Sequence, residues 1–290
     1  MQSMAMRVLV ATDLSAAGDE AIRQASKLVG ADGALAAVHV LPYLQAVSTL
    51  FPQAHAEEAV NESQITERVA NAVGERVAAI AKREAEIFVD QGTDYAEIVR
   101  RAEVWKAEVV VLGSHGHSGL SRVLGGVAER VVRHVHCRAL IARASAPLGC
   151  VLAATDLSEP SLPAVVAAVT EARRLGVALK VANAVDYPQL EAFEVLGLGT
   201  PTTVDPAKLR DTARHRLSTM MESAGVTAEG LVLEGPASEV IVAEAIRLGA
   251  GLIVVGSRGW SGFSRLMLGS VAEEILRTAP CSVLVVRTAQ

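Results

Sequence analysis

Short runs of apolar, mostly β-branched residues alternate along the chain with longer stretches in which apolar residues recur at helical spacing. Most of the runs are apolar almost throughout, which is typical of strands buried on both faces of a parallel sheet. Each half of the chain contains five such runs. They span 7–12, 34–40, 86–89, 108–112 and 138–142 in the first half, and 150–154, 178–184, 231–234, 252–255 and 282–286 in the second.

The stretches between these runs predict helices. Residues 57–87 are typical of a long charged helix with one apolar face, and Asp205 followed by Pro206 is typical of an N-cap and a first helical residue. The first helix covers 19–29, and its apolar stripe is formed by Ala21, Ile22, Ala25, Leu28 and Val29. Strands that alternate with helices predict an α/β fold with right-handed crossovers and a doubly wound sheet. Ligands of such sheets bind beyond the carboxyl ends of the strands.

The chain contains the same pattern twice. The segment VLVATDLS at 8–15 returns as VLAATDLS at 151–158, and VVVLGSHG at 109–116 returns as LIVVGSRG at 252–259, both 143 residues later. Near the end of each copy, CRALIAR and CSVLVVR are 144 residues apart. A period of this length matches a whole domain. The repeat therefore predicts two tandem domains, 1–146 and 147–290, joined by a short segment of small residues.

Composition excludes several classes of protein. The net charge of −5 argues against a protein that binds the phosphate backbone of nucleic acids, and 3% aromatic residues argue against a surface for stacking unpaired bases. No apolar run approaches the roughly 18–20 residues that span a bilayer. Asp13 follows the N-terminus too closely for a signal peptide, so we expect a cytoplasmic protein without membrane contacts. Three cysteines do not form a disulfide framework. Cys137 and Cys281 are buried reduced thiols or, alternatively, reactive ones.

A group of glycines in the second half suggests a phosphate-binding loop. Gly256 and Gly259 end an apolar strand, and Gly269 and Ser270 follow after nine further residues, directly before a helical pattern. The sequence predicts Ser270 as the N-cap of that helix. Free amide groups in the first helical turn attract anions, and glycines let the backbone approach them closely. The alternative is that the glycines only turn the chain and the serine only caps the helix.

The spacing G-x2-G-x9-G-[ST] between a strand and a helix resembles the nucleotide motif of the universal stress protein family. The opening A-T-D-L-S also resembles the first strand and turn of that family, and the resemblance covers nearly the whole chain, twice. It implies two domains, each with a five-stranded parallel sheet of order 3-2-1-4-5 flanked by helices. In one subgroup of the family it implies ATP at the strand ends.

The resemblance implies ten nucleotide-binding residues in the second half. Three of them would lie beside the adenine and ribose, one would offer backbone groups to the adenine, three would line the ribose and phosphates, and three would donate to the phosphates. In that order they are Ala154, Thr155 and Asp156; Ala184; Gly256, Arg258 and Gly259; and Gly269, Ser270 and Val271. Two of these residues have alternative roles: Asp156 could be a carboxylate that stabilises a turn, and Arg258 could be an ordinary solvated cation.

The first half departs from this motif. Its loop between the glycine pairs is one residue shorter, which moves the second pair by up to about 3.5 Å, and Gly126 replaces the hydroxyl of Ser270. We therefore expect the second half to bind nucleotide better and the first site to be weak, empty or altered. The residues of this weaker site would be Thr12, Asp13, Val40, Gly113, Gly116, Gly125 and Gly126.

The motifs give no catalytic residue. No lysine follows the glycines as in a P-loop, and no group of side chains has the spacing of metal ligands, so neither catalytic nor metal-binding residues are predicted. His136 and Cys137 lead into a strand, and His39 ends one, where it is either a satisfied strand-end histidine or a base. A nucleotide held by backbone amides without a positioned base is bound rather than rapidly cleaved.

The prediction for function is an adenine-nucleotide-binding regulatory protein of the stress response. The expected ligand is ATP, with or without Mg²⁺, and AMP or ADP are alternatives. A slowly ATP-hydrolysing enzyme and a nucleotide-free interaction scaffold are the alternatives from other classes. Family members usually pair two domains, so this chain would form that pair internally, with a homodimer as a further option and the protein partner unspecified.

Overall fold

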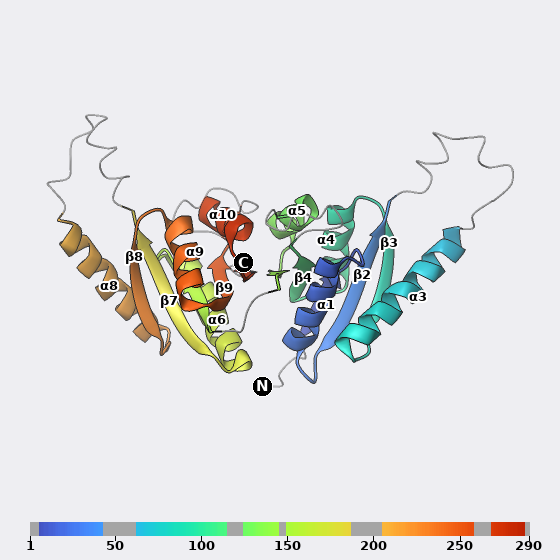
Figure 1. Ribbon diagram of the computed structural model, residues 1–290, viewed down its shortest axis with the longest axis horizontal. Helices are drawn as coiled ribbons and strands as arrows, with labels where there is room; N and C mark the ends of the chain where they lie inside the picture. Colours follow the sequence, from blue (N-terminus) through green and yellow to red (C-terminus); the bar gives the residue numbers. More distant parts are fainter. Residues whose placement is uncertain are drawn as a thin grey trace, which may run out of the picture. The chain divides into compact units, whose positions relative to one another are not determined.

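The computed structural model describes residues 6–42, 62–114, 124–144, 149–186, 205–257 and 268–287. The chain divides into two compact units, Met1–Arg143 and Ala144–Gln290, which are called the first and second unit below. Each unit is an α/β domain with one central sheet (Figure 1).

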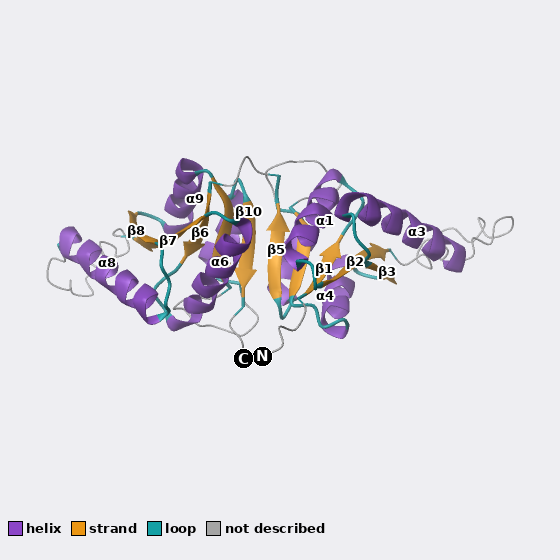
Figure 2. Ribbon diagram, turned by 90° about the horizontal axis from the view of Figure 1, so that it is seen from below, coloured by secondary structure: helices purple, strands orange, loops and turns teal. Residues whose placement is uncertain are grey.

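The sheet of the first unit contains five parallel strands. They are β1 (Arg7–Ala11), β2 (Ala34–Leu41), β3 (Glu86–Gln91), β4 (Val109–Gly113) and β5 (Arg138–Ala142), in the spatial order β3-β2-β1-β4-β5. Helices cover both faces (Figure 2). Helix α1 contacts α3, and α4 contacts α5. The four helices are α1 (Ala16–Val29), α3 (Glu62–Ala81), α4 (Asp94–Val104) and α5 (Gly126–His134).

The second unit repeats this arrangement. Its strands are β6 (Cys150–Ala154), β7 (Ala178–Val185), β8 (Glu229–Glu234), β9 (Ala250–Gly256) and β10 (Ser282–Val286), in the parallel order β8-β7-β6-β9-β10. A short 3₁₀ turn at Glu159–Ser161 precedes the first helix. The helices are α6 (Leu162–Leu175), α8 (Pro206–Ser223), α9 (Ala237–Leu248) and α10 (Ser270–Thr278). Within each unit the strand order is 3-2-1-4-5, so the predicted fold class is confirmed.

Each of the ten predicted strands is found, with ends that differ from the prediction by two residues or fewer. Their central residues form the core: Leu9, Ile141, Leu152 and Ile253 are fully buried. The N-cap prediction also holds, because the Asp205 side chain accepts a hydrogen bond from the amide of Ala207 at 2.9 Å and Pro206 is the first residue of α8.

The prediction of one helix over 57–87 is wrong at its end. Helix α3 stops at Ala81, and β3 begins at Glu86, inside the range given to the helix. The reason is local, since Lys82 has a φ of 52° and its amide closes the last helical turn onto the carbonyl of Ala78. A residue in this left-handed region ends a helix. The predicted beginning, residues 57–61, lies outside the described residues.

The burial predicted for Cys281 is confirmed, whereas Cys137 is not fully buried. Cys150 and Cys281 are buried, Cys137 is half-buried, and none of the three forms a disulfide. Burial raises the pKa of the Cys150 thiol, which keeps it protonated at neutral pH. Within the described segments, no helix has the combination of length and apolar character that crossing a membrane requires.

A buried ion pair joins β3 to α4 in the first unit. Asp90 is 8% exposed and accepts two hydrogen bonds from Arg101, one of them from Nε at 2.9 Å, while Arg100 approaches the same carboxylate at 3.1 Å. The guanidinium carbon of Arg101 lies 4.1 Å from the centre of the Phe88 ring. In the second unit, 143 residues later, Leu233 and Glu244 occupy the positions of Asp90 and Arg101. The network therefore belongs to the first unit alone.

Candidate functional site

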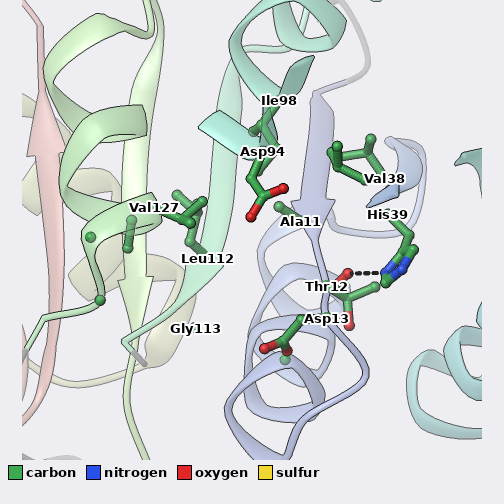
Figure 3. Close-up of a pocket in the computed structure, with 15 residues that line it drawn as sticks. Ala11, Thr12, Asp13, Val38, His39, Asp94, Ile98, Leu112, Gly113 and Val127 are labelled. Atoms are coloured by element: carbon green, nitrogen blue, oxygen red, sulfur yellow. Dashed lines mark hydrogen bonds between the residues drawn. The ribbon is translucent and has the colours of Figure 1, made fainter. Parts of the chain in front are cut away.

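A cavity of about 330 Å³ opens at the carboxyl ends of β1, β2 and β4 in the first unit (Figure 3). It lies where β1 and β4 are neighbours and the strand order reverses, which is the usual ligand site of doubly wound sheets. Its volume falls in the range of about 300–1,000 Å³ that ligand pockets occupy. The cavity is lined by Ala11, Thr12, Asp13, Gly18, Val38, His39, Val40, Asp94, Ile98, Leu112, Gly113, Gly125, Gly126, Val127 and Ala128.

The turn after β1 is held by its own side chains. Thr12 Oγ1 accepts from the amide of Leu14 at 3.1 Å, and Asp13 Oδ1 accepts from the amide and the hydroxyl of Ser15 at 3.0 and 2.5 Å. These bonds hold Leu14 at a φ of 64°, which is unusual for a branched side chain. The turn thus points the Asp13 carboxylate toward the cavity while one of its oxygens stabilises the backbone.

The same turn recurs in the second unit. Thr155 Oγ1 and Asp156 Oδ1 accept from the amides of Leu157 and Ser158, both at 3.0 Å, and Leu157 has a φ of 62°. Asp156 therefore has the turn-stabilising role that the sequence offered as the alternative to ligand binding. The two roles are compatible because a carboxylate has two oxygens.

His39 lines the cavity from β2, and sequence reasoning gave it no binding role. Its Nδ1 lies 2.8 Å from the carbonyl oxygen of Thr12 (Figure 3). Because a carbonyl only accepts, Nδ1 must carry the hydrogen, which leaves Nε2 as an acceptor in the neutral ring. In the second unit Asn183 takes this place, and its Nδ2 donates to the carbonyl of Thr155 at 2.9 Å. The shared feature is a side-chain donor that fixes the end of the first strand.

This equivalence yields a prediction for His39. His39→Leu should lower the free energy of unfolding by about 1 kcal/mol, because the Thr12 carbonyl loses its side-chain donor. His39→Asn should keep most of the wild-type free energy of unfolding, because the side-chain amide of Asn183 donates the equivalent hydrogen bond in the second unit. Urea unfolding of the two variants, followed by circular dichroism, checks the difference. Equal loss in both variants would show that the hydrogen bond is not what His39 supplies.

Gly113, at the end of β4, is a glycine because of a close backbone contact. A Cβ at this position would lie 2.8 Å from both the carbonyl carbon and the oxygen of Ala17 in α1. Gly18, also on the cavity wall, has a similar role, since its Cβ would lie 2.7 Å from Thr12 Oγ1. The second unit has Ser161 at the position of Gly18, and its hydroxyl lies 2.7 Å from Thr155 Oγ1.

The N-termini of α5 and α10 correct two details of the predicted phosphate site. The N-cap of α10 is Gly269, and Ser270 is its first helical residue, so the prediction of Ser270 as N-cap is wrong. The amide of Gly269, expected to donate to phosphate, instead donates to the carbonyl of Ser257 at 2.9 Å. Gly125 does the same toward Ser114 at 2.8 Å. The loop before each helix therefore uses these amides to close onto the preceding strand.

The next amides remain suitable for an anion. The amides of Ser270 and Val271 in α10, and of Gly126 and Val127 in α5, belong to the first helical turn, whose N–H groups have no acceptor within a helix. Gly126 and Val127 line the cavity. Each unit thus presents the positive end of a helix at the carboxyl edge of its sheet.

The predicted residues of the second unit gather at the same edge as far as the structure describes them. Ala154 and Gly256 end β6 and β9, and Ala184 is the second-last residue of β7. Thr155 and Asp156 follow directly after β6. Arg258 and Gly259 lie outside the described residues, as does Gly116 of the first unit. In the first unit, the other six predicted residues all line the one cavity: Thr12, Asp13, Val40, Gly113, Gly125 and Gly126.

The charge on the cavity wall comes from two carboxylates. Asp13 and Asp94 line it, and its described lining includes neither lysine nor arginine. Asp94 is the first residue of α4, and the sequence pattern gave no sign of it, since an acidic residue there is common in helices. The part of the chain that the structure describes contains no group of three or more side chains able to hold a metal ion.

A second, more open cavity of about 380 Å³ adjoins the first along α4 and α5. It shares Asp94, Gly126 and Val127 with the first cavity and adds Thr93, Tyr95 and Arg130. The guanidinium carbon of Arg130 lies 5.3 Å from the centre of the Tyr95 ring. The mouth of the site therefore lies between the N-termini of two helices.

The sequence matches the universal stress protein family over residues 4–143 and again over 150–287. A universal stress protein of Mycobacterium tuberculosis is 32% identical over 194 residues, which cover 63% of this chain and 62% of the relative. A universal stress protein of Thermus aquaticus is 34% identical over 139 residues, covering 47% of this chain and 97% of the relative.

Among solved structures, a universal stress protein from Archaeoglobus fulgidus matches 99% of this chain and 100% of its own, with a TM-score of 0.69 and 20% identity. This similarity supports the fold of both units. With two family matches in tandem and the same sheet order in each unit, the chain belongs to the universal stress protein family.

Proposed function

We propose that the chain binds an adenine nucleotide, ATP or one of its shorter relatives, and acts as a regulatory protein of the stress response. The observation that carries the proposal is the cavity of about 330 Å³ at the reversal of strand order in the first unit. Membership of the universal stress protein family supports it. The two sites of the chain would lie at the carboxyl edges of the two sheets.

The cavity wall offers a partner for each part of a nucleotide. The backbone at Val40, near the end of β2, suits the edge of the adenine, and the Asp13 carboxylate suits the ribose hydroxyls. The first-turn amides of Gly126 and Val127 suit a phosphate group. In the second unit, Ala184, Asp156 and the first turn of α10 would have the same roles.

The described wall favours binding over rapid hydrolysis. Phosphoryl transfer depends on cations that neutralise the phosphates and on a group that positions the nucleophile. The described lining of the cavity offers two carboxylates and His39, but neither lysine nor arginine to neutralise the phosphates. We therefore propose a protein that holds its nucleotide and signals its presence. Mg²⁺ would accompany ATP from solution, and we assign no residue to it.

The second unit is proposed to bind the phosphates of ATP more strongly than the first. Ser270 adds a hydroxyl donor where the first unit has Gly126. Ala237 begins α9 where Asp94 begins α4, so one carboxylate is missing from that edge. Both differences favour a polyanion in the second unit.

The test adds a carboxylate at each helix N-terminus in turn. Ser270→Glu should lower the affinity for ATP at least tenfold, because the added charge lies where phosphate would bind, whereas Gly126→Glu should have a smaller effect on total ATP binding. Isothermal titration of ATP into the full chain measures both. At a ligand concentration 100-fold above Kd, ATP should stabilise the wild type by about 2.7 kcal/mol, and this stabilisation should fall in Ser270→Glu.

Alanine variants at the same positions are the controls. Ser270 is exposed, and a Cβ at Gly126 meets no atom within 4 Å, so neither position opposes a new side chain. Gly126→Ala should therefore bind ATP nearly as the parent does, whereas Ser270→Ala loses only the hydroxyl donor and should weaken ATP binding much less than Ser270→Glu. If both glutamate variants are stabilised by ATP as much as the wild type, the nucleotide binds elsewhere and the proposal fails.

A further inference from the structure

The Asp94 carboxylate is turned into the cavity of the first unit. Figure 3 shows it directed from α4 toward Ala11 and Leu112, in the space between the end of β1 and the first turn of α5. The residue lines both the main cavity and the adjoining open one. Any group held by the amides of Gly126 and Val127 would therefore lie beside this carboxylate.

No described residue neutralises the Asp94 charge. Its carboxylate forms neither a hydrogen bond nor an ion pair with the part of the chain that the structure describes. Arg130, the arginine in the described lining of the open cavity, has its guanidinium carbon 5.3 Å from the centre of the Tyr95 ring and forms no ion pair with Asp94. Asp13, the other carboxylate of the cavity, is hydrogen-bonded to Ser15. Asp94 is exposed to solvent and lies in the first turn of α4, and it places a carboxylate that is unpaired with any described side chain where a polyphosphate would extend.

The second unit lacks a carboxylate at the position of Asp94. Helix α9 begins with Ala237 at the position of Asp94, 143 residues later, and the aromatic and cationic neighbours of the open cavity are also replaced, with Ser238 for Tyr95 and Glu274 for Arg130. The two units share the turn, the strand-end donor and the helix N-terminus. They differ at these three positions: the first unit has a carboxylate and an exposed arginine, and the second has an exposed glutamate at the position of the arginine.

We propose that Asp94 makes the first unit select adenine compounds of low negative charge, adenosine or AMP ahead of ATP, so that the two units of one chain bind different ligands. This inference rests on the proposed function, because it assumes that an adenine compound occupies the cavity. A carboxylate beside a phosphate chain repels each of its charges, and the repulsion grows from adenosine through AMP to ATP. The neutral adenosine end of the ligand is not repelled.

The experiment uses the full chain with Ser270→Glu, which removes phosphate binding from the second unit, and compares Asp94 with Asp94→Asn and Asp94→Glu. Adenosine has no phosphate and can still bind to the second unit, but this contribution is the same in all three variants because Asp94 lies in the first unit. Isothermal titration gives Kd for adenosine, AMP and ATP. Asp94→Asn should lower the ratio of Kd for ATP to Kd for adenosine about tenfold, while Asp94→Glu, which keeps the charge, should leave the ratio close to the parent's. The difference should shrink as the salt concentration rises, because salt screens exposed charges.

Two controls identify the source of the signal. Addition of Gly126→Glu to the same chain should remove the remaining ATP binding, which assigns that binding to the first unit. Asp32→Asn removes an exposed charge before β2, at the opposite edge of the same sheet, and should leave the ratio unchanged.

The outcomes separate the two proposals. If adenosine, AMP and ATP bind with equal affinity and Asp94→Asn changes none of the ratios, the selectivity inference is overturned while nucleotide binding stands. Weaker binding of ATP with Mg²⁺ in Asp94→Asn would also overturn it, because the carboxylate would then assist a cation. If no adenine compound binds to any variant, the proposed function fails, and this inference fails with it.

Discussion

Replacement of Asp90 by alanine is expected to lower the free energy of unfolding of the first unit by about 3 kcal/mol. Asp90 is 8% exposed and Arg101 19% exposed, and two hydrogen bonds join them, so the variant leaves a guanidinium with little access to water. Leaving one partner of a buried ion pair alone costs more than the pair contributes. Hydrogen exchange should show the loss of protection in β2 and β3, with no change in the strands of the second unit.

Two further variants show whether the loss comes from the buried charge. Replacement of both partners, as Asp90→Leu with Arg101→Leu, should recover most of the stability, because an apolar pair leaves no charge unpaired. Arg100→Ala should cost less than about 1 kcal/mol, because its side chain is 48% exposed and its ion pairs are accessible to solvent. A double leucine variant as unstable as Asp90→Ala would show that the ion pair itself stabilises the unit.

Gly113→Ala should destabilise the first unit by about 1–3 kcal/mol and weaken ligand binding there. The new methyl group would lie 2.8 Å from the backbone of Ala17, and backbone atoms cannot rotate away as a side chain can. Either β4 or the start of α1 must move, and both form the wall of the cavity. Urea unfolding measures the loss of stability, and titration with adenosine measures the loss of binding.

Gly126→Ala is the matched control for this change. The substitution is the same and the residue lines the same cavity, but a Cβ there meets no atom within 4 Å. Its position in the first turn of α5 also favours alanine over glycine slightly. Equal stability of the two alanine variants would contradict the role given to the contact between β4 and α1.

Much of the fold could be predicted from the alternation of apolar runs and helical patterns. A strand buried on both faces must be apolar along its whole length, so few sequences suit it. Runs such as VVVLG and SVLVV can therefore be recognised as strands from the sequence alone. Helix ends were harder. Helix α3 ends because the backbone of Lys82 is left-handed, and the residue types in 57–87 do not indicate this conformation. The strand order came from family resemblance, because the pattern alone does not order the strands.

The site was predictable where it depends on backbone and not where it depends on side-chain direction. Gly113, Gly125 and Gly126, which the family resemblance and the match between the two halves assigned to the weaker site, line the cavity. Asp94 and His39 could not be placed there from the sequence, because their direction into the cavity depends on how α4 and β2 pack. The use of the Gly269 amide by Ser257 was likewise hidden, since a hydrogen bond between loop and strand leaves no trace in the sequence.

Leu14 and Leu157 show that neither unit is at its optimum of stability. Each is held at a φ near 60° by the hydrogen bonds of its turn, in a region that costs a leucine of the order of 1 kcal/mol. The hydrogen bonds that fix the turn involve the backbone amide, which every residue except proline provides. Protein engineering could therefore begin at these two positions, where a glycine or asparagine would adopt the native backbone more easily and leave the sheets and cavities untouched.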